Sequence, residues 1–186
     1  DPTKADNTFG GWYTTAECTI PFDFNTGITG ATTLYAKWTP LPKYQVTFDT
    51  VGGSIVTAQE VIEGKKATKP TDPTKADNTF GGWYTTAECT TPFDFNTGIT
   101  GATTLYAKWT PLPRYQVTFD TDGGTAVASQ QVVMGEKAVA PADPTKSAYA
   151  FKGWFTSKSG TENFNFNTTP ITTNITVYAQ WVSIIM

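Results

Sequence analysis

The side chains that most often carry out catalysis are scarce in this chain of 186 residues. It contains no histidine, 2 cysteines, and 16 acidic against 13 basic residues, for a net charge of −3. Without histidine, neither a Ser-His-Asp triad nor a histidine-ligated metal site is available. Cys18 and Cys89 are 89 − 18 = 71 residues apart, and one thiolate in each neighbourhood cannot build a zinc site. We therefore predict that the chain is not an enzyme and binds no metal or cofactor.

Paired carboxylates need a separate test, because a glycosidase requires two of them flanking one bond. Glu88 and Asp94 come nearest to this pattern, but Ser159 and Asn165 stand 71 residues further on. We interpret the two carboxylates as solvated surface charges. The stretch 120–124 resembles a calcium loop, but it lacks the further acidic ligands that such a loop requires. We expect a hairpin turn there.

Aromatic side chains are the strongest candidates for binding. They make up 14% of the chain and could stack on sugar rings if several lined one exposed face. Because they recur at fixed positions on alternating segments, we favour a role in the core. Asn167 and Asn174 match the glycosylation pattern, which is frequent by chance. Lys108 is a poor candidate for an isopeptide cross-link, since Gln180 replaces it in the last copy of the repeat.

Both cysteines occupy the same position of that repeat, and Gly160 replaces them in the last copy. A disulfide within one repeat is therefore excluded. We interpret Cys18 and Cys89 as small, partly buried thiols, with a bridge between repeats or between chains as the alternative.

An internal repeat positions all of these residues. The stretch Phe80–Thr85 also occurs at 9–14 and, with changes, at 151–156, so that its tryptophan recurs every 71 residues (83 − 12 and 154 − 83). A second tryptophan follows in each copy. A fixed period of this kind sets the architecture of the chain. The six tryptophans are Trp12, Trp38, Trp83, Trp109, Trp154 and Trp181.

The period divides the chain into one partial and two complete repeats. We expect the later half of a repeat at 1–38, complete repeats at 44–109 and 115–181, and linkers at 39–43 and 110–114. Because the chain starts in the middle of a repeat, we expect it to be a fragment, so the missing signal peptide is uninformative.

Each complete repeat is expected to be mainly β-structure, small α+β at most. Tyr44–Thr50 alternates apolar and polar residues, and a Gly52-Gly53 turn and a second strand at 57–62 would complete a hairpin. Phe80–Thr85 is expected to be a strand whose two glycines form a bulge or allow close packing. Phe93–Phe95 alternates again, 86–91 allows one short helical turn, and 103–109 is the last strand.

The segments between repeats predict a spacer. Thr-Pro-Leu-Pro at 39–42 and at 110–113 favours a stiff, extended connection. A unit of about 70 residues should be about 25–30 Å across, so units in series would form an elongated array. The scattered lysines exclude a basic footprint for nucleic acid, and no apolar run is long enough to span a bilayer.

Three motifs in fixed order resemble the Listeria–Bacteroides repeat, the family that includes the B repeat of internalin B. They are Tyr-Gln-Val-Thr-Phe-Asp-Thr-Asp-Gly-Gly at 115–124, Phe-Lys-Gly-Trp-Phe at 151–155 and Val-Tyr-Ala-Gln-Trp at 177–181. This resemblance implies a small β-grasp-like fold with little helix, in secreted or wall-attached bacterial proteins. It also implies a role in adhesion or spacing. The cysteines are not part of the family pattern.

Two functional hypotheses follow. The first is a non-catalytic stalk of a bacterial surface protein that supports adhesion. The second is direct binding of a host protein or glycan through exposed aromatic residues or a strand edge. Residues 1–38 lack an opening hairpin under any choice of boundary. They either stand alone, exchange strands with another copy of the chain, or belong to a folded unit that is out of phase with these boundaries.

Overall fold

Alternating sequences and glycine turns produce a chain of strands. The computed structural model describes residues 1–184, which contain ten strands and no helix. The chain forms two compact units, one comprising 1–75 and 80–109 and the other 76–79 and 110–186. The first unit holds a two-stranded and a four-stranded sheet, and the second holds one four-stranded sheet.

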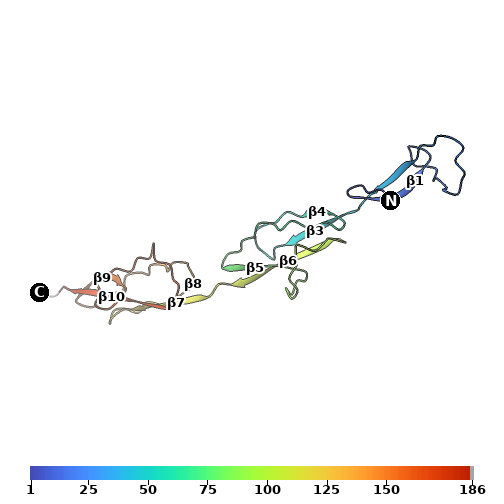
Figure 1. Ribbon diagram of the computed structural model, residues 1–186. Helices are drawn as coiled ribbons and strands as arrows, with labels where there is room; N and C mark the ends of the chain where they lie inside the picture. The colour runs from blue at the N-terminus through green and yellow to red at the C-terminus, as the bar shows by residue number, and fades with distance from the viewer. Residues whose placement is uncertain (185–186) are drawn as a thin grey trace. The chain divides into compact units, whose positions relative to one another are not determined.

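The middle repeat forms the four-stranded sheet of the first unit, in the order β4-β3-β6-β5 (Figure 1). Its first two strands, β3 (Lys43–Asp49) and β4 (Gln59–Ile62), form the expected antiparallel hairpin. The last strand, β6 (Thr103–Pro111), adds parallel to β3 and lies beside β5 (Asn78–Tyr84). The first and last strands of the repeat are therefore the two central strands, which is the sheet order of a β-grasp fold.

The apolar side of each alternating strand forms the core of the middle repeat. Val46 and Leu105 are fully buried, and Trp83 and Ile99 are each 3% exposed. The predicted faces are correct: Val46 and Phe48 point into the core from β3, and Leu105 and Ala107 from β6. The burial is greatest where β3 and β6 run side by side, as expected for the centre of a sheet.

The third repeat has the same topology, in the order β8-β7-β10-β9. Its strands are β7 (Arg114–Asp120), β8 (Gln130–Val133), β9 (Tyr149–Phe155) and β10 (Ile175–Ser183). The extra residue falls in a loop: Ile171 bonds to the backbone of Gly135 and Glu136 just as Ile99 bonds to that of Gly64 and Lys65. Mainly-β tandem repeats are thus present as predicted.

The paired glycines of the tryptophan strand form a bulge. The register between β1 (Asn7–Tyr13) and β2 (Tyr35–Pro40) shifts between Phe9 and Trp12. Gly11 has a φ of 104° and the corresponding Gly82 a φ of 106°, a conformation that L side chains rarely adopt. The glycines do not serve to pack Trp83 closely, because a Cβ at Gly81 would meet Lys108 at 3.4 Å and one at Gly82 would meet Tyr84 at 3.9 Å.

Residues 1–38 fold as the antiparallel pair β1–β2 alone. Strand β2 starts at Tyr35, whereas the equivalent strand of the middle repeat starts at Thr103, the counterpart of Thr32. Thr32–Leu34 have no parallel partner strand, so they do not adopt strand structure. The later half of a repeat therefore keeps its hairpin, but not the shape of its last strand, without the opening half.

Local details differ from the sequence-based expectations in two places. Phe93–Phe95 is not a strand: Phe93 donates to Trp83 O at 2.9 Å, and then Asp94 accepts from Asn96 N and turns the chain. Residues 86–89 form a turn rather than a helical turn, closed by Cys89 N and Thr86 O. Across residues 1–184, no helix is long and apolar enough to cross a membrane.

Candidate functional site

A cleft of about 360 Å³ lies on the third repeat, between the β7 turn, the segment before β9 and strand β10. We call it the β10 cleft. Its lining combines aromatic rings with charged and amide side chains, which is the mixture that a binding site for polar ligands would require. The lining residues are Asp122, Lys146, Tyr149, Lys158, Tyr178, Ala179, Gln180 and Trp181.

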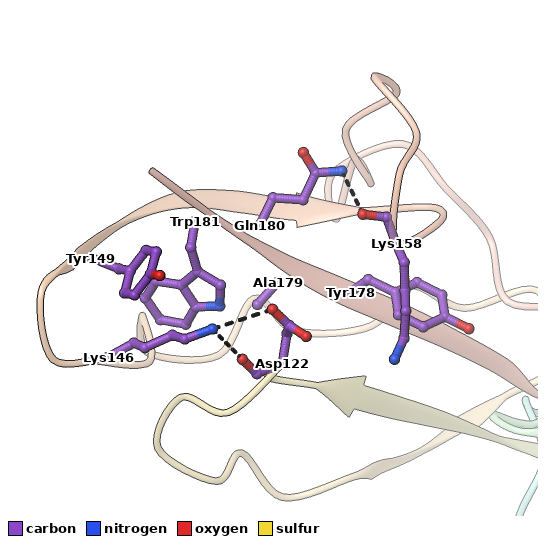
Figure 2. Close-up of a pocket in the computed structure, with 8 residues that line it drawn as sticks. All are labelled: Asp122, Lys146, Tyr149, Lys158, Tyr178, Ala179, Gln180 and Trp181. Atoms are coloured by element: carbon purple, nitrogen blue, oxygen red, sulfur yellow. Dashed lines mark hydrogen bonds and ion pairs between the residues drawn. The ribbon is translucent and has the colours of Figure 1, made fainter. Parts of the chain in front are cut away.

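Lys146 is the central cation of the β10 cleft. Figure 2 shows its side chain extending beside the Trp181 indole toward Asp122, with the Tyr149 ring on the same side. Its Nζ donates to the backbone oxygen of Asp122 at 2.6 Å and to Oδ2 at 3.3 Å. It lies 4.9 Å from the Tyr149 ring centroid and 5.7 Å from that of Trp181. The cation is therefore paired with a carboxylate and with two aromatic faces.

The β7 turn fixes the indole of Trp181. Its Nε1 donates to Thr121 O at 3.0 Å. A Cβ at Gly124 would lie 2.5 Å from Trp181 Cζ2, so only glycine fits at this turn position. The tryptophan is thus packed against backbone on one side and reached by Lys146 on the other.

A second ion pair closes the other end of the cleft. Lys158 Nζ lies 3.1 Å from Asp120 Oδ2 and 5.9 Å from the Tyr178 ring centroid. The backbone N–H of Asp122 donates to Asp120, and this bond, together with Lys158, lowers the pKa of Asp120. The Asp120 carboxylate in turn raises the pKa of Lys158. Both groups are therefore charged at neutral pH.

Gln180 completes the cleft by binding backbone. Its Nε2 donates to Gly160 O at 2.6 Å and lies 3.4 Å from Lys158 O (Figure 2). This amide ties the loop after β9 to strand β10.

Half of the cleft is particular to the third repeat. The lysine and tryptophan recur in the middle repeat, where Lys75 donates to Val51 O at 2.8 Å and lies 5.8 Å from the Trp109 ring centroid. The other polar and aromatic residues do not recur. At the places of Asp122, Tyr149, Lys158 and Gln180, the middle repeat has Val51, Asn78, Ala87 and Lys108.

The arrangement can hold a polar surface but offers no group poised for catalysis. The cations Lys146 and Lys158 are each paired with an aspartate, and the described residues contain no cluster of three potential metal ligands. Tyr149, which is 42% exposed, is the aromatic ring of this cleft most open to solvent. The cleft can therefore stack one ring or accept hydrogen bonds, and the same contacts also fasten the β7 turn to β10.

The candidate carboxylates found in the sequence serve local structure. Asp94 accepts from the backbone N–H of Asn96 at 2.8 Å, and Glu88 is exposed. The aspartates of 120–124 accept from Asp122 N and pair with the two lysines, and Gly124 N donates to Thr121 O as in a hairpin turn.

The aromatic residues are mostly core, as favoured from the sequence. Trp83 is 3% and Trp154 6% exposed, and the other four tryptophans are half-buried. Cys18 and Cys89 are unpaired and partly buried. Asn167 is exposed in a loop, whereas the Asn174 side chain accepts from Gln116 N at 2.8 Å. Lys108 lies 5.0 Å from the Tyr84 ring centroid.

The turn lysine was missed by sequence reasoning, although its signal was present. Asp-Pro-Thr-Lys occurs at 1–4, 72–75 and 143–146. In the two complete repeats its threonine exchanges backbone and hydroxyl hydrogen bonds with the residue after the Gly-Gly turn, Ser54 or Thr125. Its lysine then reaches the turn itself. The motif therefore locks the opening hairpin onto the rest of the repeat.

The repeated motifs and this sheet order define a β-structured tandem repeat. The chain belongs to the Listeria–Bacteroides repeat domain family, whose model matches residues 1–37, 44–108 and 115–180.

Curated relatives share this array as part of longer proteins. The chain is 37% identical over 97% of its length to a predicted membrane protein of Evansella cellulosilytica, and 36% identical over 97% to a Gly-rich one of the same organism. It is 38% identical over 74% of its length to internalin H of Listeria monocytogenes. The chain spans only about a quarter of each relative, 27%, 21% and 25% respectively.

Proposed function

We propose that this chain is a non-catalytic spacer within a bacterial protein displayed outside the cell, and that it supports adhesion by holding another domain away from the surface. The observation that supports this most is the near identity of its copies. Residues 1–50 and 72–121 differ only at Ile20/Thr91 and Lys43/Arg114. Neighbouring copies of one module add length, whereas they add nothing to a unique active site.

The domain plan is part of this proposal. Repeats at 44–109 and 115–181 follow a partial repeat at 1–38, with connections at 39–43 and 110–114. The strands run into these connections, so that only Leu41–Pro42 and Leu112–Pro113 separate consecutive strands. Two residues ending in a proline give little room for a flexible joint. Such connections support a chain whose reach depends on the number of repeats.

A replacement experiment tests the spacer role. The chain is placed between a cell-wall anchor and a small binding domain, and capture of beads carrying the ligand is measured. We expect capture to fall when the repeats are deleted and to return when an unrelated rod of equal length replaces them. Loss of capture with the unrelated rod would contradict the proposal, because it would show that the repeat surface itself is needed.

The β10 cleft favours a second candidate, direct binding of a host glycan or protein. Tyr149 and the paired lysines are specific to one repeat or partly so, as a binding site would be. A glycan array probed with the chain, and with Tyr149→Ala as the control, would test it. Binding that survives Tyr149→Ala would exclude a site in the cleft.

A further inference from the structure

Residues 1–38 expose an apolar surface that the middle repeat buries. We call it the acceptor face; it surrounds a cleft of about 340 Å³ lined by Phe22, Phe24, Thr26, Ile28, Thr32 and Leu34. Ile28 is 61% exposed, whereas its counterpart Ile99 is 3% exposed. Because the two sequences are almost identical, the difference comes from what covers them and not from the residues themselves.

The middle repeat shows what covers this face. Its opening half, residues 43–71, contributes Val46 and Phe48 to the same core as Ile99 and Leu105. In the parallel pairing of β3 with β6, Val46 lies opposite Thr103 and Phe48 opposite Leu105. Their counterparts in residues 1–38 are Thr32 and Leu34, which lack a neighbouring strand (Figure 1).

The polar contacts of an opening half also have unused counterparts. Ile99 O accepts from Gly64 N at 2.8 Å, and Ile99 N donates to Lys65 O at 2.8 Å. Thr74 O accepts from Ser54 N at 2.8 Å, and Trp109 Nε1 donates to Thr50 O at 2.8 Å. The same donors and acceptors are present in residues 1–38 on Ile28, Thr3 and Trp38.

A glycine keeps the space for this contact open. A Cβ at Gly98 would lie 2.7 Å from Gly64 O, a backbone atom that cannot move aside easily. At the counterpart Gly27, a Cβ would meet nothing within 4 Å. In the third repeat Pro170 occupies this place, in a loop that is one residue longer. Gly27 is thus dispensable for residues 1–38 alone, but not for their pairing with an opening half.

We propose that the acceptor face binds the opening half of a repeat of this type carried by a separate polypeptide. The bound segment would add as a parallel strand beside Thr32–Leu34 and extend β2, completing a four-stranded sheet from two molecules. Main-chain hydrogen bonds would provide affinity, and the pockets for valine and phenylalanine would provide specificity.

A second copy of this chain is not the occupant that the structure favours. Each copy has two opening halves, and both already pair with later halves, β3 with β6 and β7 with β10. Donating one of them would expose another face of the same kind, so the exchange would gain nothing. The partner is therefore an opening half that no later half already covers.

The test uses the whole chain and a synthetic peptide of residues 43–71. Isothermal titration calorimetry should show one peptide bound per chain, and acrylamide should quench tryptophan less in the complex because Trp12 and Trp38 become covered. A peptide carrying Val46→Asp and Phe48→Asp should not bind. Absence of binding by the unmodified peptide would overturn the proposal.

Two matched variants of the chain locate the site. Gly27→Ala should weaken peptide binding at least ten-fold, because its methyl group would meet the Gly64 oxygen of the peptide. Gly30→Ala should leave binding unchanged, since a Cβ meets nothing within 4 Å at Gly30 or at its counterpart Gly101. Equal binding by both variants would overturn the proposal.

Sedimentation of the chain alone distinguishes the remaining occupant. We expect a monomer. A dimer that Phe24→Asp dissociates would show that a second copy covers the face, and would also overturn the proposal. The inference rests on the fold and not on the spacer role, so either can fail without the other.

Discussion

At the scale of single residues, glycines define where parts of a repeat touch. Gly53 and Gly124 lie flat against Trp109 and Trp181, and Gly98 lies against the backbone of Gly64. None of the three has a positive φ, so close approach and not backbone conformation explains the glycine. The sequence predicted the turn at Gly52-Gly53, but it could not show which tryptophan approaches it, because 59 residues separate Thr50 from Trp109.

Gly53→Ala should destabilise the middle repeat by about 1–3 kcal/mol, since the added methyl would lie 2.5 Å from Trp109 Cζ2 and 3.1 Å from Thr74 O. Urea unfolding followed by tryptophan emission measures the change. Gly101→Ala is the matched control, because nothing lies within 4 Å of its Cβ. It should change stability by no more than about 0.5 kcal/mol. Equal effects of the two substitutions would contradict the packing described for the turn.

The Asp120 carboxylate predicts a small loss of stability in acid. Its pKa is lowered in the folded chain by the Asp122 N–H and by Lys158. Its stabilisation is therefore present above the unfolded-state pKa of about 4 and is lost as pH falls through the lower folded pKa. Solvent screening limits it to a few tenths of a kcal/mol.

Asp120→Asn keeps an acceptor for the Asp122 N–H and removes the titration. The parent should be the more stable of the two at pH 6, and the difference in unfolding free energy should shrink between pH 4 and pH 2. Chemical unfolding across this range measures it. A constant difference down to pH 2 would show that the carboxylate does not contribute through its charge.

At the scale of elements, alternation predicted strands well and their partners poorly. Tyr44–Thr50 and 103–109 correspond to β3 and β6 within one or two residues. Alternation identifies which face is buried, but it does not show that these two strands lie side by side, since parallel partners can be far apart in sequence. Phe93–Phe95 has the same alternation and is not a strand, because Asp94 bonds to Asn96 N and turns the chain.

The turn before β9 contains a strained residue. Ala148 has a φ of 65°, where the other copies have Asp6 and Asp77, each with a φ of 59°. Aspartate tolerates this left-handed conformation better than alanine does. Part of the stability of the third repeat is therefore lost at this alanine.

Ala148→Gly should stabilise the third repeat by about 0.5–1 kcal/mol, because glycine adopts a positive φ without strain. Thermal unfolding should show a higher midpoint. Ala150→Gly, two residues further on within β9, is the control and should lower the midpoint, since glycine weakens a strand interior. A lower midpoint for both variants would contradict the assignment of strain to Ala148.

At the scale of the whole molecule, the 71-residue period was the most informative feature of the sequence. It predicted one partial and two complete copies, and the family model matches three segments in the same order. The β10 cleft could not be predicted in this way, because it depends on residues in which the third copy differs from the second. Tyr149 and Lys158 are meaningful only once β9 and β10 are known to be adjacent.

The central claim is that each repeat adds a fixed length to a stiff array. Small-angle X-ray scattering on the chain, and on a variant with a second copy of residues 44–114 inserted, tests it most directly. We predict that the maximum dimension increases by about 25–30 Å with the added copy, and that the radius of gyration exceeds ~16 Å even without it. A radius near 16 Å that rises only to about 18 Å would instead be that of a compact globule, and would contradict the claim.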